Sequence, residues 1–467
     1  MQKLKELFAP RDLTKGKPWI GIVLFSIPLL IGNFIQQLYS AVDAIVVGNF
    51  VGDTALGAVG LVFPIINIMI VLFMGIATGA TIVVAQAFGA KNKLEISQCV
   101  GTVNTLTFIS GIVIAVLGLL SVHPLLRMLD TPPEMFDMAA DYLVIFLIGI
   151  VGMGYYNILG GILRGLGDSV GPLIYLIIAS AMNVVLDIVF VVYFNMTTDG
   201  VALATIISQG FSAYLCFRRL SKMTDIVSLD KKYLKPEKNM VMRIVHLGVP
   251  ASITTVIFSA AGLLAQSITN SFGINIVTAV TAVMRVDGFA MMPNFTFGIA
   301  ATTFTAQNYG ANRMDRIKIG ITNTMLFALG TSTAITLLIL FFGENLVRIF
   351  TNTEAVVHYA MQMLRMLSVG YVAFGATQVL MGVMRGVGET LKPMWASIIY
   401  TVVIRLPIAY LWVHFTVSPL LPQGDYNAIM GSLLVAWVIG FFITLVMFLR
   451  MKKKGCFDYI LTEEEKG

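Results

Sequence analysis

The sequence has few charged residues and few cysteines, and each scarcity excludes a class of protein. Only 12% of the 467 residues are charged, while 57% are hydrophobic. Soluble domains carry about 25% charged residues, so this composition is not that of a water-soluble domain. The three cysteines, Cys99, Cys216 and Cys456, are far apart and show neither disulfide nor metal-ligand spacing. A disulfide-stapled scaffold is therefore excluded as well.

Catalytic motifs are also missing. The chain contains no GxSG, HExxH or P-loop string. The stretch 165–168 spells the GxGD string of intramembrane aspartyl proteases, but the same stretch later in the chain ends in Glu389. We interpret both stretches as helix caps in loops. The sequence thus predicts a protein that is not an enzyme and that needs no cofactor.

What the sequence has in abundance is long apolar runs. A membrane-spanning helix needs roughly 20 consecutive apolar residues, and the runs here reach that length, whereas β-barrel strands alternate in short segments. The sequence predicts an all-α membrane protein with twelve transmembrane helices. The expected spans are 18–48, 55–83, 98–121, 139–160, 172–195, 201–218, 246–271, 276–306, 319–342, 360–383, 394–416 and 428–449.

The cationic residues predict the orientation of these spans. With the N-terminus inside, 26 of the 31 Lys and Arg residues fall in the N-terminal tail, the C-terminal tail and the loops of one side. Cationic residues favour the cytoplasmic side, so both termini are expected in the cytoplasm and the protein in the plasma membrane. Because the net charge of +6 flanks spans rather than one domain, no nucleic-acid partner is expected.

The chain repeats itself with an offset of 221 residues. Ala85-Gln86 and Gly89-Ala90 match Ala306-Gln307 and Gly310-Ala311, and the stretch 161–168 matches 382–389. One constant offset across distant motifs indicates a duplication. We predict an N-lobe over 1–220 with spans 1–6, a cytoplasmic linker over 221–239, and a C-lobe over 240–467 with spans 7–12. Six spans per half make this a parallel repeat, as in secondary transporters.

Acidic residues inside the first half are the main functional candidates, because buried charges in membranes are rare and usually functional. Asp43 lies deep in span 1. Asn183 and Asp187 lie one helical turn apart in span 5 and share a face, and Thr205 of span 6 adds a hydroxyl. Two carboxylates with an amide oxygen could bind Na⁺. The two acids could instead share a proton, or each could make a separate interhelical hydrogen bond.

The second half has three charged residues within its spans. Arg285 and Asp287 stand two positions apart in span 8 and therefore face different sides. Arg405 of span 11 is a candidate partner for one of them. A structural ion pair and a role in the substrate cavity are both open for these residues.

In this order the motifs resemble the MATE (multidrug and toxic compound extrusion) family over nearly the whole chain. The residues that carry the resemblance are Ser40–Asp43, Ala85–Ala90, Leu163–Asp168, Asn183–Asp187, Met384–Glu389 and, in an external loop, Asp130–Glu134. The resemblance implies antiport of amphipathic or cationic organic compounds against Na⁺ or H⁺ by alternating access. It also implies an ion site at Asp43, Asn183, Asp187 and Thr205, with Gln36 and Asn157 in the nearby cavity.

One departure from the family concerns the second half. NorM-like members have further carboxylates in spans 7 and 10, where this chain has none between 253 and 270 or between Val372 and Gln378. The resemblance therefore implies coupling in the first half. Expected partners are drug-like small molecules and the lipid bilayer, with a monomeric protein. The alternative is a lipid-linked precursor flippase of the same wider superfamily.

Overall fold

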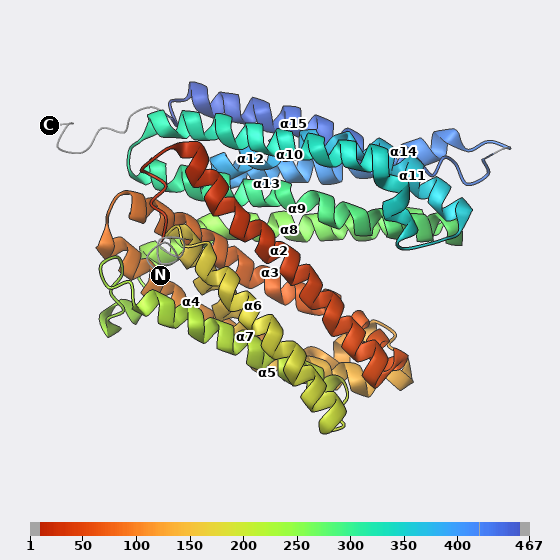
Figure 1. The fold of residues 1–467 in the computed structure, drawn as a ribbon, viewed down its shortest axis with the longest axis horizontal. Coiled ribbons are helices and arrows are strands. Elements are labelled where there is room, and N and C mark those ends of the chain that lie inside the picture. The colour runs from red at the N-terminus through yellow and green to blue at the C-terminus, as the bar shows by residue number, and fades with distance from the viewer. Residues whose placement is uncertain (1–9, 420, 458–467) are drawn as a thin grey trace. The chain divides into compact units, whose positions relative to one another are not determined.

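The computed structural model describes residues 10–419 and 421–457, and these are almost entirely helical (Figure 1). Eleven helices in the described part are long and apolar enough to cross a membrane, or twelve when one bent pair counts as a single span. The prediction of an all-α, twelve-span membrane protein is confirmed. The helices of the first half are α2 (Pro18–Val46), α3 (Asp53–Gly89), α4 (Lys93–Met128), α5 (Pro133–Gly165), α6 (Val170–Ile188) and α7 (Thr198–Ser221).

The second half repeats these helices. Its helices are α8 (Lys238–Asn270), α9 (Ile274–Gly310), α10 (Met314–Arg348), α11 (Glu354–Ser368), α12 (Gly370–Gly386), α13 (Leu391–Ile398), α14 (Leu406–Thr416) and α15 (Ala428–Lys453). Helices α3 and α9 both have 37 residues, and their bounds differ by the offset of 221 at each end. The turns repeat too, since Gly167 and Gly388 both take a positive φ, which glycine adopts at no steric cost.

The halves are not identical, and two of the differences concern helix breaks and loop length. Helix α5 is continuous, but its counterpart is divided at Val369 into α11 and α12, which meet at a bend of 43°. The predicted span 360–383 is this broken span. Gly370, at the break, lies against the ring of Trp437, where a Cβ would not fit. In addition, the loop 417–427 lengthens the connection before α15, so the last helix departs from the 221-residue offset.

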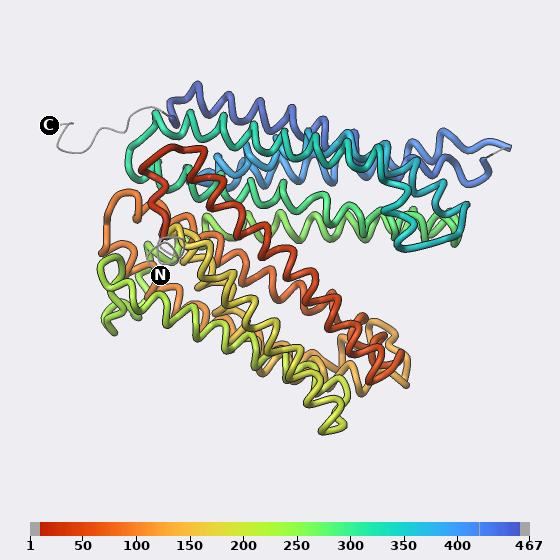
Figure 2. Tube along the Cα trace, in the orientation of Figure 1, coloured from red at the N-terminus to blue at the C-terminus, as the bar shows by residue number. Residues whose placement is uncertain are grey.

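The chain folds as two compact units that follow the two halves except at two segments. The first unit contains Ile27–Ser252, and the second contains Leu13–Ser26 with Ile253–Gly467. In the first, α5 packs against α3, α4 and α7; in the second, α9 packs against α10, α11 and α12 (Figure 2). Each unit has its own apolar core. The start of α8 thus belongs to the first unit, and Leu13–Ser26, which includes the first turns of α2, belongs to the second. The predicted division instead lay at the linker 221–239.

Glycines explain how α8 begins inside the first unit. Gly75 and Gly79, one helical turn apart on α3, contact Ser252 and the carbonyl of Ile244. Small residues spaced in this way let two membrane helices approach closely. The Ser252 hydroxyl also donates to the carbonyl of Val71 at 2.9 Å. The predicted boundary at residue 240 missed this packing because it followed the repeat alone.

The segment before α2 is held in the second unit by polar side chains of α9 and α10. The backbone N–H of Leu13 donates to Gln307 Oε1 at 3.0 Å. The buried guanidinium of Arg316 donates to the carbonyls of Leu13, Lys15 and Gly16 at 2.9–3.1 Å. These bonds satisfy backbone groups that would otherwise be buried without partners.

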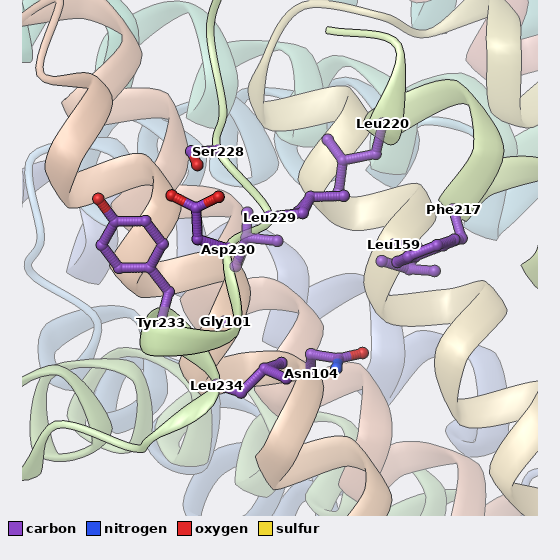
Figure 3. A pocket seen from close by; sticks show the side chains of 11 residues that line it. Gly101, Asn104, Leu159, Phe217, Leu220, Ser228, Leu229, Asp230, Tyr233 and Leu234 are labelled. Atoms are coloured by element: carbon purple, nitrogen blue, oxygen red, sulfur yellow. The ribbon is translucent and has the colours of Figure 1, made fainter. Parts of the chain in front are cut away.

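The linker between the halves packs on the first unit. Thr105 donates to the carbonyl of Leu234 at 2.5 Å, and Gly101 of α4 lies against the backbone of Tyr233. Figure 3 shows the cavity of about 150 Å³ that remains between this linker and the ends of α4, α5 and α7. Asp230 and Asn104 are among its polar lining residues. The linker is therefore a packed segment of the first unit.

Candidate functional site

Two acidic side chains meet inside the first unit, from helices far apart in the sequence. Asp43 projects from α2, and Asp187 lies at the end of α6, where its side chain is fully buried. Their carboxyl groups lie within hydrogen-bonding reach of each other. The Oδ1 atom of each is buried and has no hydrogen-bond partner among the described residues. A buried carboxylate oxygen without a hydrogen bond costs free energy, because it has left water and found no partner. A bound cation or proton would remove this cost.

Asn183 and Thr205 complete this cluster. Asn183 is fully buried and Thr205 is 7% exposed. In the orientation of the Asn183 amide that satisfies both of its polar atoms, Nδ2 donates to Asp187 Oδ2 at 3.0 Å and Oδ1 accepts from the Thr205 N–H at 3.3 Å. The amide thus holds Asp187 in place. The four predicted ion-site residues lie together; their oxygens are hard donors of the kind that Na⁺ prefers, and the two carboxylates can take up a proton.

Two tyrosines near the acids were not among the sequence candidates. The hydroxyl of Tyr39 donates to Thr205 Oγ1 at 3.4 Å, and the buried Tyr142 of α5 interacts electrostatically with both acids. Tyr39 precedes Asp43 by four residues and so shares its helix face. That spacing was a signal for Tyr39, whereas nothing in the sequence pointed to Tyr142.

The helix carrying each acid changes its winding just past the acid. The π-helical turn η1 (Val47–Val51) follows α2, and η2 (Val189–Tyr193) follows α6. The two turns pack against each other. Such turns are rare and occur frequently at functional sites, because widening the helix re-aims the side chains around it. The site is therefore flanked by two adaptable stretches of backbone.

In the second unit, Asp287 of α9 lies beside Tyr371 of α12 and Arg405. Asp287 interacts with the Tyr371 hydroxyl and with the charge of Arg405, although Asp287 Oδ1, Tyr371 OH and Arg405 Nε have no hydrogen-bond partner of normal geometry among the described residues. Arg405 is 6% exposed and ends the π-helical turn η4 (Ile399–Arg405). Arg285 is exposed and lies outside this cluster. The spacing of Arg285 and Asp287 indicated that they face different sides.

The remaining cavity candidates lie on α2 and α5. Gln36 is an exposed residue of α2, and Asn157 is a half-buried residue of α5 whose amide donates to the carbonyl of Met153 at 2.9 Å. Across the described residues, no group of three or more His, Cys, Asp or Glu side chains has the geometry of a metal site. A cation at Asp43 and Asp187 would need the neutral oxygens of Asn183 and Thr205 as well.

Two repeated bundles of membrane helices with ionisable groups buried inside them are the architecture of secondary transporters. The MatE family model matches the chain twice, over residues 28–189 and 250–411, and the chain belongs to this family. The two matches stand 222 residues apart, close to the 221-residue offset of the repeat.

Among curated proteins, the probable multidrug resistance protein YoeA of Bacillus subtilis is 30% identical over 89% of this chain and 91% of its own length. The probable multidrug resistance protein NorM of Thermotoga maritima is 24% identical over 84% and 85%. A crystal structure of MATE in the bent conformation has a TM-score of 0.87 at 26% identity, covering 95% of this chain and 98% of the other.

A structure of an outward-facing multidrug resistance MATE family transporter gives the same TM-score at 25% identity, with the same coverage. These similarities confirm the family resemblance and the two-lobe helical architecture. The protein is a multi-pass membrane protein of a transporter family.

Proposed function

We propose that this protein is a secondary multidrug efflux transporter of the plasma membrane, with both termini in the cytoplasm. It exports amphipathic or cationic organic compounds in exchange for Na⁺ or H⁺ by alternating access. The observation that carries the proposal is the buried pair of Asp43 and Asp187, each with an orphaned carboxylate oxygen. The multidrug resistance relatives support the class of substrate.

The acid pair supports ion coupling on energetic grounds. A charged side chain at the centre of a bilayer costs at least about 2.5–3.5 kcal/mol, and two adjacent carboxylates also repel each other. Both costs fall when a cation or a proton enters. The closed form of the first unit is thus stable only with the ion bound, and the ion-free form favours a hydrated site.

Export follows if the drug prefers the other form, because a ligand shifts an equilibrium only through differential affinity. Ion entry from outside tightens α2, α6 and α7 around Asn183 and Thr205. The π-helical turns and Pro28, inside α2, supply backbone that can bend. Tightening reduces the room for a drug near Gln36 and Asn157, and the drug leaves outward.

The second unit gives no support to a lipid-linked precursor flippase. A flippase cavity for phosphates needs net positive charge, yet the buried Arg405 lies next to the carboxylate of Asp287. We assign these residues a supporting part in the substrate cavity, together with Arg285. Drug-like compounds are the proposed partners, and a monomer is the proposed functional unit.

The test is gradient-driven efflux of a cationic dye by purified protein in liposomes, with Na⁺ and proton gradients imposed separately. Asp43→Asn and Asp187→Asn keep the side-chain shape and remove the charge, so both should abolish coupled efflux while inserting normally. The gradient that drives the wild type identifies the ion. Wild-type rates in both variants would refute the coupling site, and dye movement independent of either gradient would refute antiport.

A further inference from the structure

The second unit has a basic groove at the ends of α13 and α15. We call it the C-half groove, and it is lined by Lys392, Trp395, Met447, Arg450, Met451 and Lys454. Its volume is about 440 Å³. Both helices belong to candidate membrane spans, so the groove lies where a span reaches the membrane surface.

The groove has cationic side chains at its rim that pair with no acidic side chain in the described part of the chain. Lys392 pairs with Glu389 at 2.8 Å. Arg450 and Lys454 are exposed, and neither forms an ion pair within the described ranges 10–419 and 421–457. The groove therefore has a net positive charge of about two, available to an anionic ligand.

The rest of the lining is apolar and suits the interface of a membrane. Trp395 is 55% exposed, and tryptophan is enriched at the depth of lipid headgroups. Met451 is buried and Met447 is half-buried between the cations and the apolar part of α15. A ligand for this groove needs an anionic head and an apolar body, which a free inorganic ion lacks.

The repeat provides an internal comparison. The matching groove of the first unit, about 260 Å³, is lined by Gly171, Ile174, Tyr175 and Arg219. Gly171 and Ile174 stand 221 positions before Lys392 and Trp395.

In this first-unit groove the one cation is neutralised. Arg219 pairs at 2.9 Å with Asp168, which is 1% exposed. Net charge and an interfacial tryptophan are thus specific to the second unit.

From these observations we propose that the C-half groove binds the headgroup of an anionic phospholipid. Basic pockets between membrane helices on the cytoplasmic side bind such headgroups. The phosphate lies between Arg450 and Lys454, and the upper acyl chain lies along Trp395 and Met447. The proposal is independent of the coupling ion and of the exported compound.

The test uses the full chain in nanodiscs of phosphatidylcholine and measures quenching of Trp395 fluorescence by brominated lipids. A parallel Trp395→Phe protein gives the signal of the other three tryptophans, which is subtracted. Brominated phosphatidylglycerol should quench Trp395 at a lower mole fraction than brominated phosphatidylcholine. Equal quenching by the two lipids would refute the proposal.

A matched pair of variants separates the groove from the general charge of the tail. Each cation near an anionic surface contributes roughly a fivefold preference. Arg450→Gln with Lys454→Gln should therefore lower the preference for phosphatidylglycerol about twenty-five-fold. Lys452→Gln with Lys453→Gln removes the same charge from side chains that do not line the groove and should lower the preference clearly less than the groove pair does. Equal losses would overturn the assignment of the groove.

Two further arms test other occupants. Sodium phosphate should lower the lipid preference no more than sodium chloride of equal ionic strength; a specific loss in phosphate would identify a soluble anion as the ligand. A chain ending at Phe457 lacks the acidic run 463–465. In this chain, brominated lipids should quench Trp395 fluorescence as they do in the full chain. Lipid binding that appears only after the truncation would show that the C-terminal tail occupies the groove.

Discussion

Replacing Thr205 by valine tests whether the acid cluster binds an ion or only holds the helices together. The substitution removes the hydroxyl and keeps the branched shape. In the structure this hydroxyl makes two long contacts, 3.4 Å from the Tyr39 hydroxyl and 3.4 Å from the Asn183 amide, compared with about 2.7–2.8 Å for a normal O–H···O bond. Asn183 can still accept from the backbone N–H of residue 205. We therefore expect the unfolding free energy without ion to change by less than about 1 kcal/mol.

Ion affinity should change more than stability. Loss of one neutral oxygen ligand from a buried cation costs about 1–2 kcal/mol, which corresponds to roughly 5–30-fold weaker binding. Thr205→Ser retains the hydroxyl and serves as the matched control. A ligand that binds only the folded state raises stability in proportion to the logarithm of its concentration above Kd.

The assay is thermal unfolding of the purified protein in detergent, titrated with NaCl against choline chloride. The wild type and Thr205→Ser should be stabilised over the same Na⁺ range, and Thr205→Val should need roughly tenfold more Na⁺. If Thr205→Val follows the wild type, the hydroxyl is not an ion ligand. If it unfolds much earlier without Na⁺, its role is structural. If the wild type responds to pH but not to Na⁺, the Na⁺ site is refuted.

Three further predictions concern topology, a helix cap and the second unit. A cysteine at Pro133 should react with an impermeant maleimide from outside intact cells and one at Lys232 should not; the reverse result would invert the orientation. Asp168→Ala should lower the unfolding free energy by about 2 kcal/mol, since Asp168 accepts from the Gly171 N–H at 2.8 Å at the start of α6 and pairs with Arg219. Asp168→Asn should lose about half as much, and a neutral result in thermal unfolding would contradict this. Asp287→Asn should lower dye efflux in liposomes far less than a change at the acid pair, and complete loss would move coupling to the second unit.

The helical membrane fold was predictable because hydrophobicity alone forces it. Every backbone polar group in a bilayer must be satisfied within the segment, so a long apolar run specifies a helix without knowledge of its neighbours. The offset of 221 residues also relates the ends of α9 and α12 to those of α3 and α5, although the predicted spans ended a few residues earlier, at 306 and 383. The break at Val369 escaped prediction, because it depends on the approach of Trp437 to Gly370.

The candidate site was partly predictable. Asn183 and Asp187 share a face of one helix, a relation that the helical period determines. The approach of Asp43 on α2 to this face was a prediction from the cost of burying acids and from the family resemblance, because no local pattern determines it. Tyr142 has no local signal, since a tyrosine in an apolar helix is an ordinary core residue. The roles of these residues in ion binding remain predictions until efflux and ion titrations are measured.

By itself the sequence determined which runs span a membrane and where the repeat begins. It also determined which charged residues are costly to place in the bilayer and are therefore candidates for a function. These properties depend on short-range periodicity and on the cost of moving a residue into lipid. Tertiary structure alone decided which segments meet. The start of α8 joins the first unit through Gly75 and Gly79, and the C-half groove combines α13 with α15. Such contacts depend on the shapes of two distant surfaces at once, and no local pattern records them.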